Sequence, residues 1–266
     1  MGIIAEMMRT NEKTGYTGAN LTAKVCQDIV LRAIAESNLN RNVTIKGGVV
    51  MREITGDVRR ATQDIDIDFI RYSLSDQSID AFIDRLNILD GVTFTRVGEI
   101  TELSQQDYHG KRVFVKVTDD DGVNVQSKID LGVHTHFDVE QEEYCFDIAY
   151  DEEGVSLLIN SKEQMFSEKL RSLLKFGAAS TRFKDIFDMC YLKDKVEKIK
   201  LRKYIEEYIL SDTGMRENNM ADIIRRLERT FKSERYKSRL ESSDKNWIGV
   251  DIETALSGIM SFIKEI

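Results

Sequence analysis

The chain has 266 residues, of which 41% are hydrophobic and 32% charged, and it contains no proline. Its length suits one large domain or two smaller ones with a real core, and its formal charge of −8 argues against a protein that coats nucleic acid. No stretch approaches the roughly 20 apolar residues of a membrane helix, and the amino terminus lacks a secretory signal pattern. Three widely separated cysteines fit a reducing compartment, so we expect a cytoplasmic protein without a membrane partner.

The first half of the chain predicts mixed secondary structure. Residues 20–36 place apolar side chains four apart, which predicts an amphipathic helix. A short strand over 43–46 is expected to stop at Gly47-Gly48, with a short helix after it. The alternation of acidic and apolar residues over 64–70 (DIDIDFI) predicts a strand with one acidic face. Further expected elements are a helix over 76–89, strands over 92–97, 112–117, 123–133, 144–149 and 155–159, and turns at 119–122 and 151–154.

After residue 160 the pattern becomes helical. Ser161 and Gln164 have the spacing of a capping box, which predicts the start of a helix. The expected helices cover 161–176, 182–194, 200–211, 219–240 and 251–264. We therefore expect an α+β domain over 1–160 with a mixed or antiparallel sheet, followed by a helical bundle domain over 161–266. The first part holds 16 basic and 28 acidic residues and the second 22 and 18, so a polyanionic partner fits the second part better.

The carboxylates of the first half carry the clearest chemical signal. Asp64 and Asp66 share one face of their strand, and Asp130 is a lone acid among apolar neighbours in a later strand. Clustered carboxylates repel one another unless a cation neutralises them, and Mg²⁺ prefers such oxygen ligands. If the two strands are neighbours, the three acids form a two-metal site for phosphoryl transfer, while the Gly47-Gly48 turn lets backbone N–H groups approach a triphosphate. The alternative is an edge strand with a solvated acidic face.

These motifs resemble the nucleotidyltransferases of the DNA polymerase β superfamily, and more narrowly the AbiEii/AbiGii toxin family of bacterial abortive-infection toxin–antitoxin systems. The matching blocks are KGGVVMREITGDVRRATQDIDIDF (46–69), KIDL (128–131), EQMFSEKL (163–170) and GAASTRFKDIFDMCYL (177–192). The resemblance covers roughly residues 20–264. It implies a polymerase β-like nucleotidyltransferase domain and a helical domain that closes the nucleotide cleft.

The resemblance also implies roles for individual residues. Asp64, Asp66 and Asp130 would hold the metal, with Lys169 and Asp185 completing the catalytic set. The implied nucleotide-binding residues are Lys46, Gly47, Gly48, Arg60, Thr62, Arg182 and Asp188. Which of Asp185 and Asp188 reaches the active site stays open, because both fit acidic positions of the family. Asp68 departs from the pattern, since the family more often has a non-acidic residue there. For the helical residues, ordinary surface ion pairing is the alternative.

Two other clusters have competing interpretations. His134, His136 and Asp138 alternate on one strand face and could bind a transition metal, but we favour a polar strand end near the site, because the sequence points to no fourth ligand. The basic run over 222–239 could contact an RNA backbone or could be the rim of a helix whose apolar side is buried.

Together these features predict a nucleotidyltransferase toxin that uses two Mg²⁺ ions, for which Mn²⁺ could substitute. The resemblance implies that it transfers a nucleoside monophosphate from an NTP to RNA, foremost the tRNA 3′ end, and that a cognate antitoxin is encoded nearby. Transfer to a protein hydroxyl is one alternative. Another is a module that binds GTP or another NTP and acts without any transfer, and the presence of three carboxylates speaks against it.

Overall fold

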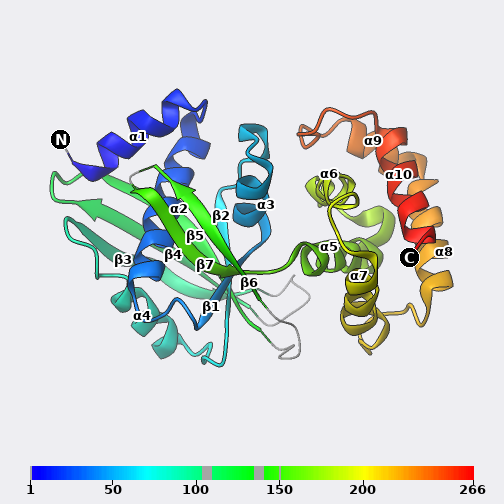
Figure 1. The fold of residues 1–266 in the computed structure, drawn as a ribbon, viewed down its shortest axis with the longest axis horizontal. Helices are drawn as coiled ribbons and strands as arrows, with labels where there is room; N and C mark the ends of the chain where they lie inside the picture. Colours follow the sequence, from blue (N-terminus) through cyan, green and yellow to red (C-terminus); the bar gives the residue numbers. More distant parts are fainter. Residues whose placement is uncertain (1, 104–109, 135–140, 150) are drawn as a thin grey trace. The chain divides into compact units, whose positions relative to one another are not determined.

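The computed structural model describes residues 2–103, 110–134, 141–149 and 151–266. The chain divides into two compact units, Met1–Asn160 and Ser161–Ile266. The first unit is built on a seven-stranded sheet with the order β3-β4-β5-β2-β1-β7-β6 (Figure 1). Its strands are β1 (Val43–Lys46), β2 (Asp64–Phe69), β3 (Val92–Glu102), β4 (Lys111–Asp119), β5 (Asn124–Val133), β6 (Glu142–Ile148) and β7 (Asp151–Ile159).

The sheet is mixed, as expected for the predicted α+β nucleotidyltransferase fold. Strand β2 runs parallel to β5 and β1 runs parallel to β7, whereas the other neighbours are antiparallel. Parallel neighbours cannot be joined by a tight turn, and the chain forms α4, β3 and β4 between β2 and β5. The acidic strand β2 lies in the middle of the sheet, between β5 and β1. The edge-strand alternative for DIDIDF is therefore wrong.

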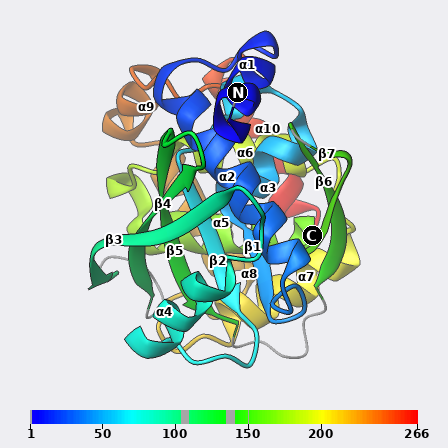
Figure 2. The ribbon, with the colours of Figure 1, turned by 90° about the vertical axis from the view of Figure 1, so that its left-hand side faces the viewer.

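One face of the sheet is covered by helices. Helix α2 (Gly18–Glu36) contacts β4, β5 and β7, while α1 (Ile3–Lys13) contacts β4 and α4 (Asp76–Arg85) contacts β3 (Figure 2). The apolar residues of the alternating strands, such as Ile65, Ile67 and Ile129, are fully buried. Because side chains alternate along a strand, their neighbours on β2 and β5 point to the other face, and that face carries the acids.

Two details of this unit differ from the predictions. Helix α1 was not predicted; its first turn is held by Asp119, whose Oδ2 accepts a hydrogen bond from the backbone N–H of Ile4 at 3.2 Å. The turn predicted at 151–154 is wrong, because these residues already belong to β7 and Asp151 pairs with Ile148. The acidic tetrapeptide mimics a turn in composition, but cross-strand pairing with β6 extends the strand through it.

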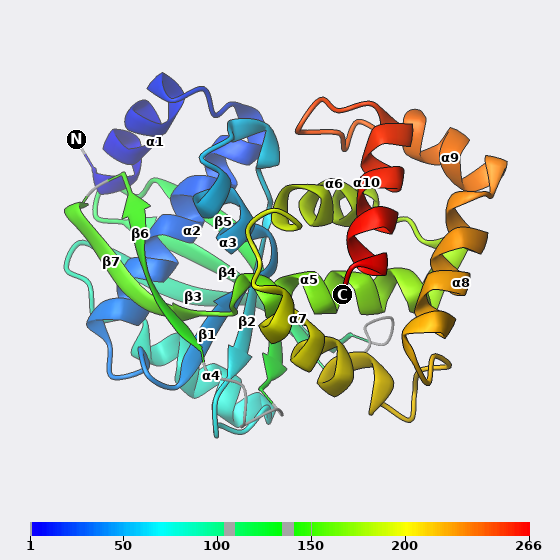
Figure 3. The same ribbon diagram turned by 45° about the vertical axis from the view of Figure 1, so that its right-hand side comes forward.

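The second unit is helical. Its helices are α5 (Lys162–Phe176), α6 (Phe183–Leu192), α7 (Lys198–Ile205), α8 (Met220–Phe231), α9 (Glu234–Glu241) and α10 (Ile252–Lys264) (Figure 3). The predicted cap is confirmed: Ser161 Oγ accepts a hydrogen bond from the Gln164 N–H at 3.2 Å. The single helix predicted over 219–240 is wrong, because Ser233 caps a new helix by accepting from Tyr236 N–H. Within the described part of the chain, no helix is long and apolar enough to span a membrane.

Candidate active site

Four charged residues form one row across the middle of the sheet. Lys46 on β1 pairs with Asp66 on β2, Asp66 pairs with Asp130 on β5, and Asp130 pairs with Arg112 on β4. Residues that are paired across neighbouring strands stand side by side on the same face. The row therefore contains two adjacent acids with one base at each end, and the register of β2 against β5 brings together acids from distant parts of the chain.

Asp64 and Asp68 lie on either side of Asp66, and each has a basic partner. Lys128 stands opposite Asp64, and its Nζ atom lies 2.8 Å from Asp64 Oδ1. The Nζ atom of Lys46 lies 2.7 Å from Asp68 Oδ1, and both of these side chains are buried. The extra acid of the alternating strand is thus the ion-pair partner of Lys46.

The outer base of the row holds Asp130 with two hydrogen bonds. Arg112 Nε donates to Asp130 Oδ1 at 2.6 Å, and Arg112 Nη2 donates to Oδ2 at 2.7 Å. Such bidentate pairs are the strong form of an ion pair. The hydrogen bonds to Asp130 raise the pKa of the Arg112 guanidinium, and the charges of Asp64 and Asp66 add to the rise. Asp130 is buried, whereas 31% of the Arg112 side chain remains exposed.

Gly47 and Gly48 stand where a larger residue would collide with the site. They are the first two residues of α3 (Gly47–Thr55), rather than a turn before it. A Cβ atom on Gly47, which has a φ of +65°, would lie 2.9 Å from Asp66 Cγ, and one on Gly48 would lie 2.5 Å from Thr62 Oγ1. The first N–H groups of a helix lack intrahelical partners and attract anions. The two glycines therefore allow a helix N-terminus to stand directly against Asp66.

The residues that lead into β2 are held from behind by α2. Arg60 ends a short 3₁₀ turn and is buried, and Thr62 follows it. Gln27 Nε2 of α2 donates to the backbone oxygen of Thr62 at 3.0 Å and lies 3.5 Å from that of Asp64. The backbone before the acidic strand is thus fixed by a buried amide that the sequence patterns did not single out.

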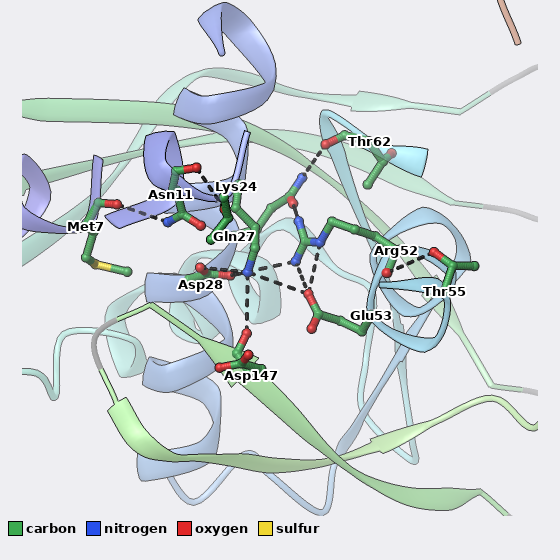
Figure 4. A network of polar contacts seen from close by, with 11 residues as sticks. Met7, Asn11, Lys24, Gln27, Asp28, Arg52, Glu53, Thr55, Thr62 and Asp147 are labelled. Carbon is green, nitrogen blue, oxygen red and sulfur yellow. Dashed lines mark hydrogen bonds and ion pairs between the residues drawn. The ribbon is translucent and has the colours of Figure 1, made fainter. Parts of the chain in front are cut away.

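Gln27 belongs to a buried polar network between α2 and α3 (Figure 4). Lys24 Nζ lies 2.6 Å from Asp28 Oδ1, and Arg52 Nη2 lies 2.7 Å from Glu53 Oε1. Arg52 also donates from Nη1 to Gln27 Oε1 and lies 3.7 Å from Asp28. The network therefore ties the helix that begins with the glycines to the helix that holds the lead-in to β2.

Burial gives this network its rigidity. Asp28 is fully buried and Arg52 is 2% exposed. Burial raises the pKa of Asp28, and the nearby Lys24 and Arg52 oppose that rise. Buried charges are tolerated only when they are paired. The signal available in the sequence was a Lys and an Asp four residues apart within an amphipathic helix, a spacing that is equally common on helix surfaces.

The predicted site residues of the second unit form their own cluster. Lys169 Nζ on α5 lies 3.0 Å from Asp185 Oδ1 and 2.8 Å from Asp188 Oδ2, both on α6. Asp185 Oδ2 also accepts a hydrogen bond from Arg182 Nε at 2.7 Å. Trp247 donates from Nε1 to Asp188 Oδ1 at 3.0 Å. Lys169 is thus held between two carboxylates in a buried position.

The two acids of this cluster differ in what they face. Asp188 has no exposed surface, and both of its oxygens lie beside Lys169 or Trp247. Asp185 instead accepts a hydrogen bond at its second oxygen, Oδ2, from Arg182, whose side chain is 58% exposed. The outward-facing end of the cluster is therefore Arg182 with Asp185.

The structure brings the predicted residues together as two groups, one in each unit. Within the described residues, no three Asp, Glu, His or Cys side chains are already gathered as a metal site, because Asp64 and Asp130 are turned toward Lys128 and Arg112. Of the possible transition-metal cluster, His134 is buried, while His136 and Asp138 lie outside the described residues. The basic run over 222–239 is partly structural, since Arg226 and Arg239 donate to the backbone oxygens of Leu174 and Ala178.

Comparison with protein-family models matches residues 29–252 to the nucleotidyl transferase AbiEii toxin family of type IV toxin–antitoxin systems. The match covers most of the chain and includes the paired acids, the glycines and the helical cluster described above. The chain belongs to this family. No curated protein matches it. Membership identifies a nucleotidyltransferase, and it implies an NTP substrate, an antitoxin partner and the use of a divalent metal ion, as is typical of such enzymes.

Proposed function

We propose that this AbiEii protein is a cytoplasmic toxin that transfers a nucleoside monophosphate from an NTP to a hydroxyl group of RNA, foremost at the tRNA 3′ end. The observation that supports the proposal best is the adjacency of Asp66 and Asp130 on one sheet face, with the α3 N-terminus directly against Asp66. A nucleotidyl transfer needs carboxylates for a metal and donors for phosphates at one place. This face offers both.

The proposed metal is Mg²⁺, with Asp64, Asp66 and Asp130 as its ligands. Their carboxylate oxygens are the donors that hard divalent cations prefer, and their shared face on β2 and β5 fits this donor set. When bound, the metal would neutralise triphosphate charge and lower the pKa of the acceptor hydroxyl. Asp64 is paired with Lys128 and Asp130 with Arg112, so ligation requires Lys128 and Arg112 to give up these ion pairs.

The chain's own groups have separate tasks in this proposal. Gly47 and Gly48 present backbone N–H groups to the phosphates, and Lys46, paired with Asp68, supports the strand beside them. Arg60 and Thr62 fix the lead-in to β2. Arg112 and Lys128, released from the acids, remain beside the site as two cations that can hold further phosphate groups.

We propose further that the helical unit closes the nucleotide cleft and that Lys169 balances the negative charge of the triphosphate. Arg182 and Asp185 would form the end of the cluster that reaches the nucleotide, because Arg182 is largely exposed. Asp188 would hold Lys169 in place, since it is fully buried between Lys169 and Trp247.

Incubation with α-labelled NTPs, Mg²⁺ and total tRNA tests the transfer. Label is expected in RNA with the wild type and not with Asp66→Ala, while Asp121→Asn, an exposed turn residue of the same unit, serves as the control. Label in protein instead of RNA would identify the other acceptor class. NTP binding without label in either would refute the transfer.

Induced expression in bacteria tests the toxic role. Growth arrest is expected with the wild type and relief with Asp64→Ala, because the proposed toxicity depends on catalysis. Equal arrest by both proteins would mean that binding alone is toxic.

A further inference from the structure

The open face of the sheet continues beyond the acids onto β4 and β3. Phe114 on β4 stands opposite Lys128 on β5 and opposite Val97 on β3, and 39% of its surface is exposed. Large aromatic side chains normally bury their area. An exposed phenylalanine in the interior of a sheet, next to a candidate active site, is therefore a candidate contact surface.

Cations surround this aromatic ring on three sides. Arg112 and Lys116 are two residues before and after Phe114, so they share its face, and Lys128 is its cross-strand neighbour. Within the described part of the chain Lys116 has no acidic partner. The further positions on the same face are Val97, which is apolar, and four neutral polar residues, Thr95, Thr118, Asn124 and Gln126.

Two acids of the candidate active site adjoin this surface. Lys128, the cross-strand neighbour of Phe114, forms an ion pair with Asp64. Arg112, two residues before Phe114 on β4, forms an ion pair with Asp130. A polyanion that lies along Lys116, Phe114 and Arg112 would consequently end at the proposed metal carboxylates. The surface thus leads from Lys116 on β4 to the carboxylates of the candidate active site.

We propose that Phe114, with Arg112, Lys116 and Lys128, forms a platform for the unpaired 3′ end of the acceptor RNA. Single-stranded RNA is bound through the stacking of bases on aromatic side chains combined with cations along the backbone, and this surface supplies both. The proposal rests on the proposed function, because it assigns the acceptor of the same site. A folded protein acceptor would need neither an exposed ring for stacking nor the row of phosphate-binding cations.

Direct binding of a fluorescein-labelled single-stranded RNA oligonucleotide, measured by anisotropy without NTP, tests the platform. Phe114→Ala should weaken binding roughly tenfold, and Phe114→Trp should restore it, because stacking accounts for the loss. Phe176→Ala removes an aromatic side chain of similar exposure, 41%, from the helical unit and should leave binding unchanged. A duplex of the same length should bind more weakly, because its bases are already stacked.

The salt dependence separates a contact from a merely structural effect. Each phosphate contact to a single strand contributes about 0.7 to the slope of log affinity against log salt. Lys116→Gln should therefore reduce that slope by about 0.7, whereas Phe114→Ala should leave it nearly unchanged. Unchanged thermal midpoints of both variants would show that the fold is intact.

The outcomes distinguish this proposal from the proposed function. If the wild type transfers label to RNA but Phe114→Ala and Lys116→Gln bind and turn over RNA like the wild type, the platform is refuted and the transfer stands. If the wild type binds the oligonucleotide through Phe114 and Lys116 but transfers no label, the platform stands and the transfer is refuted. Absence of RNA binding by the wild type would overturn the platform, even where label appears in protein.

Discussion

Two groups of ion pairs in the first unit use the same chemistry at different depths. On the open sheet face, two cations beside the proposed metal ligands are about one-third exposed, Arg112 at 31% and Lys128 at 32%. Behind α3, Asp28 and Arg52 are almost completely buried. Water can replace a partner on the open face, but it cannot do so in the buried network. The first group is therefore suited to exchange partners, and the second to fix positions.

The largest expected effect concerns chemistry on the open face. Asp66→Asn removes a charge between two acids and should lower the rate of nucleotidyl transfer by about a thousandfold, or roughly 4 kcal/mol. The thermal midpoint should change little, because Asp66 is only partly buried and lies outside the buried network. Steady-state transfer assays and calorimetry measure the two quantities. A large loss of stability would show that Asp66 is as structural as Asp28.

The buried network should show the reverse pattern. Asp28→Ala leaves Lys24 and Arg52 without their shared acid, so the free energy of unfolding should fall by about 3 kcal/mol. Glu36→Ala breaks the exposed pair Arg32–Glu36, also on α2 and also four residues apart, and should cost at most about 0.5 kcal/mol. Urea denaturation of both variants measures the contrast. Similar costs would contradict the distinction between the two depths.

Helix α3 connects the two groups, because its first residue lies against Asp66 and its Arg52 belongs to the buried network. Gly47 begins this helix and Gly56 follows its last residue. Gly47→Ala and Gly56→Ala both place a side chain at positive φ, +65° and +62°, but only the Cβ atom at position 47 meets a neighbour, the Asp66 carboxylate. Both should lose about 1 kcal/mol of stability, and only Gly47→Ala should weaken NTP binding, by tenfold or more. Nucleotide titration by calorimetry distinguishes the variants. An equal loss of affinity would assign the effect to backbone strain alone.

The smallest expected effect tests the exchange of partners. Arg112→Gln removes the cation that competes for Asp130, so Mn²⁺ affinity should rise by a few fold, since one repulsive charge next to the carboxylates is gone. Arg96→Gln breaks an ion pair with Asp80 of α4 and should leave Mn²⁺ affinity unchanged. Electron paramagnetic resonance of bound Mn²⁺ provides the measurement. A lower affinity in Arg112→Gln would mean that Arg112 orients Asp130 for the metal.

The residue types of the candidate site and their local spacing could be predicted from the sequence alone. The alternation of DIDIDF placed Asp64, Asp66 and Asp68 on one face, and the Ser161 cap marked the start of the helical part. These patterns depend on neighbours within a few residues, so they can be recognised without knowledge of the tertiary structure. The family resemblance, which rests on the order of such blocks, agrees with the family match.

The contacts between distant residues could not be predicted from local patterns and depend on the folded chain. The parallel pairing of β2 with β5 placed Asp130 beside Asp66, and the pairing of β5 with β4 placed Arg112 on Asp130 and left Phe114 exposed. Packing of α2 against α3 likewise created the network around Asp28 and Arg52. The physical reason is that strand register and helix packing are set by the burial of the whole apolar face, which no local spacing records.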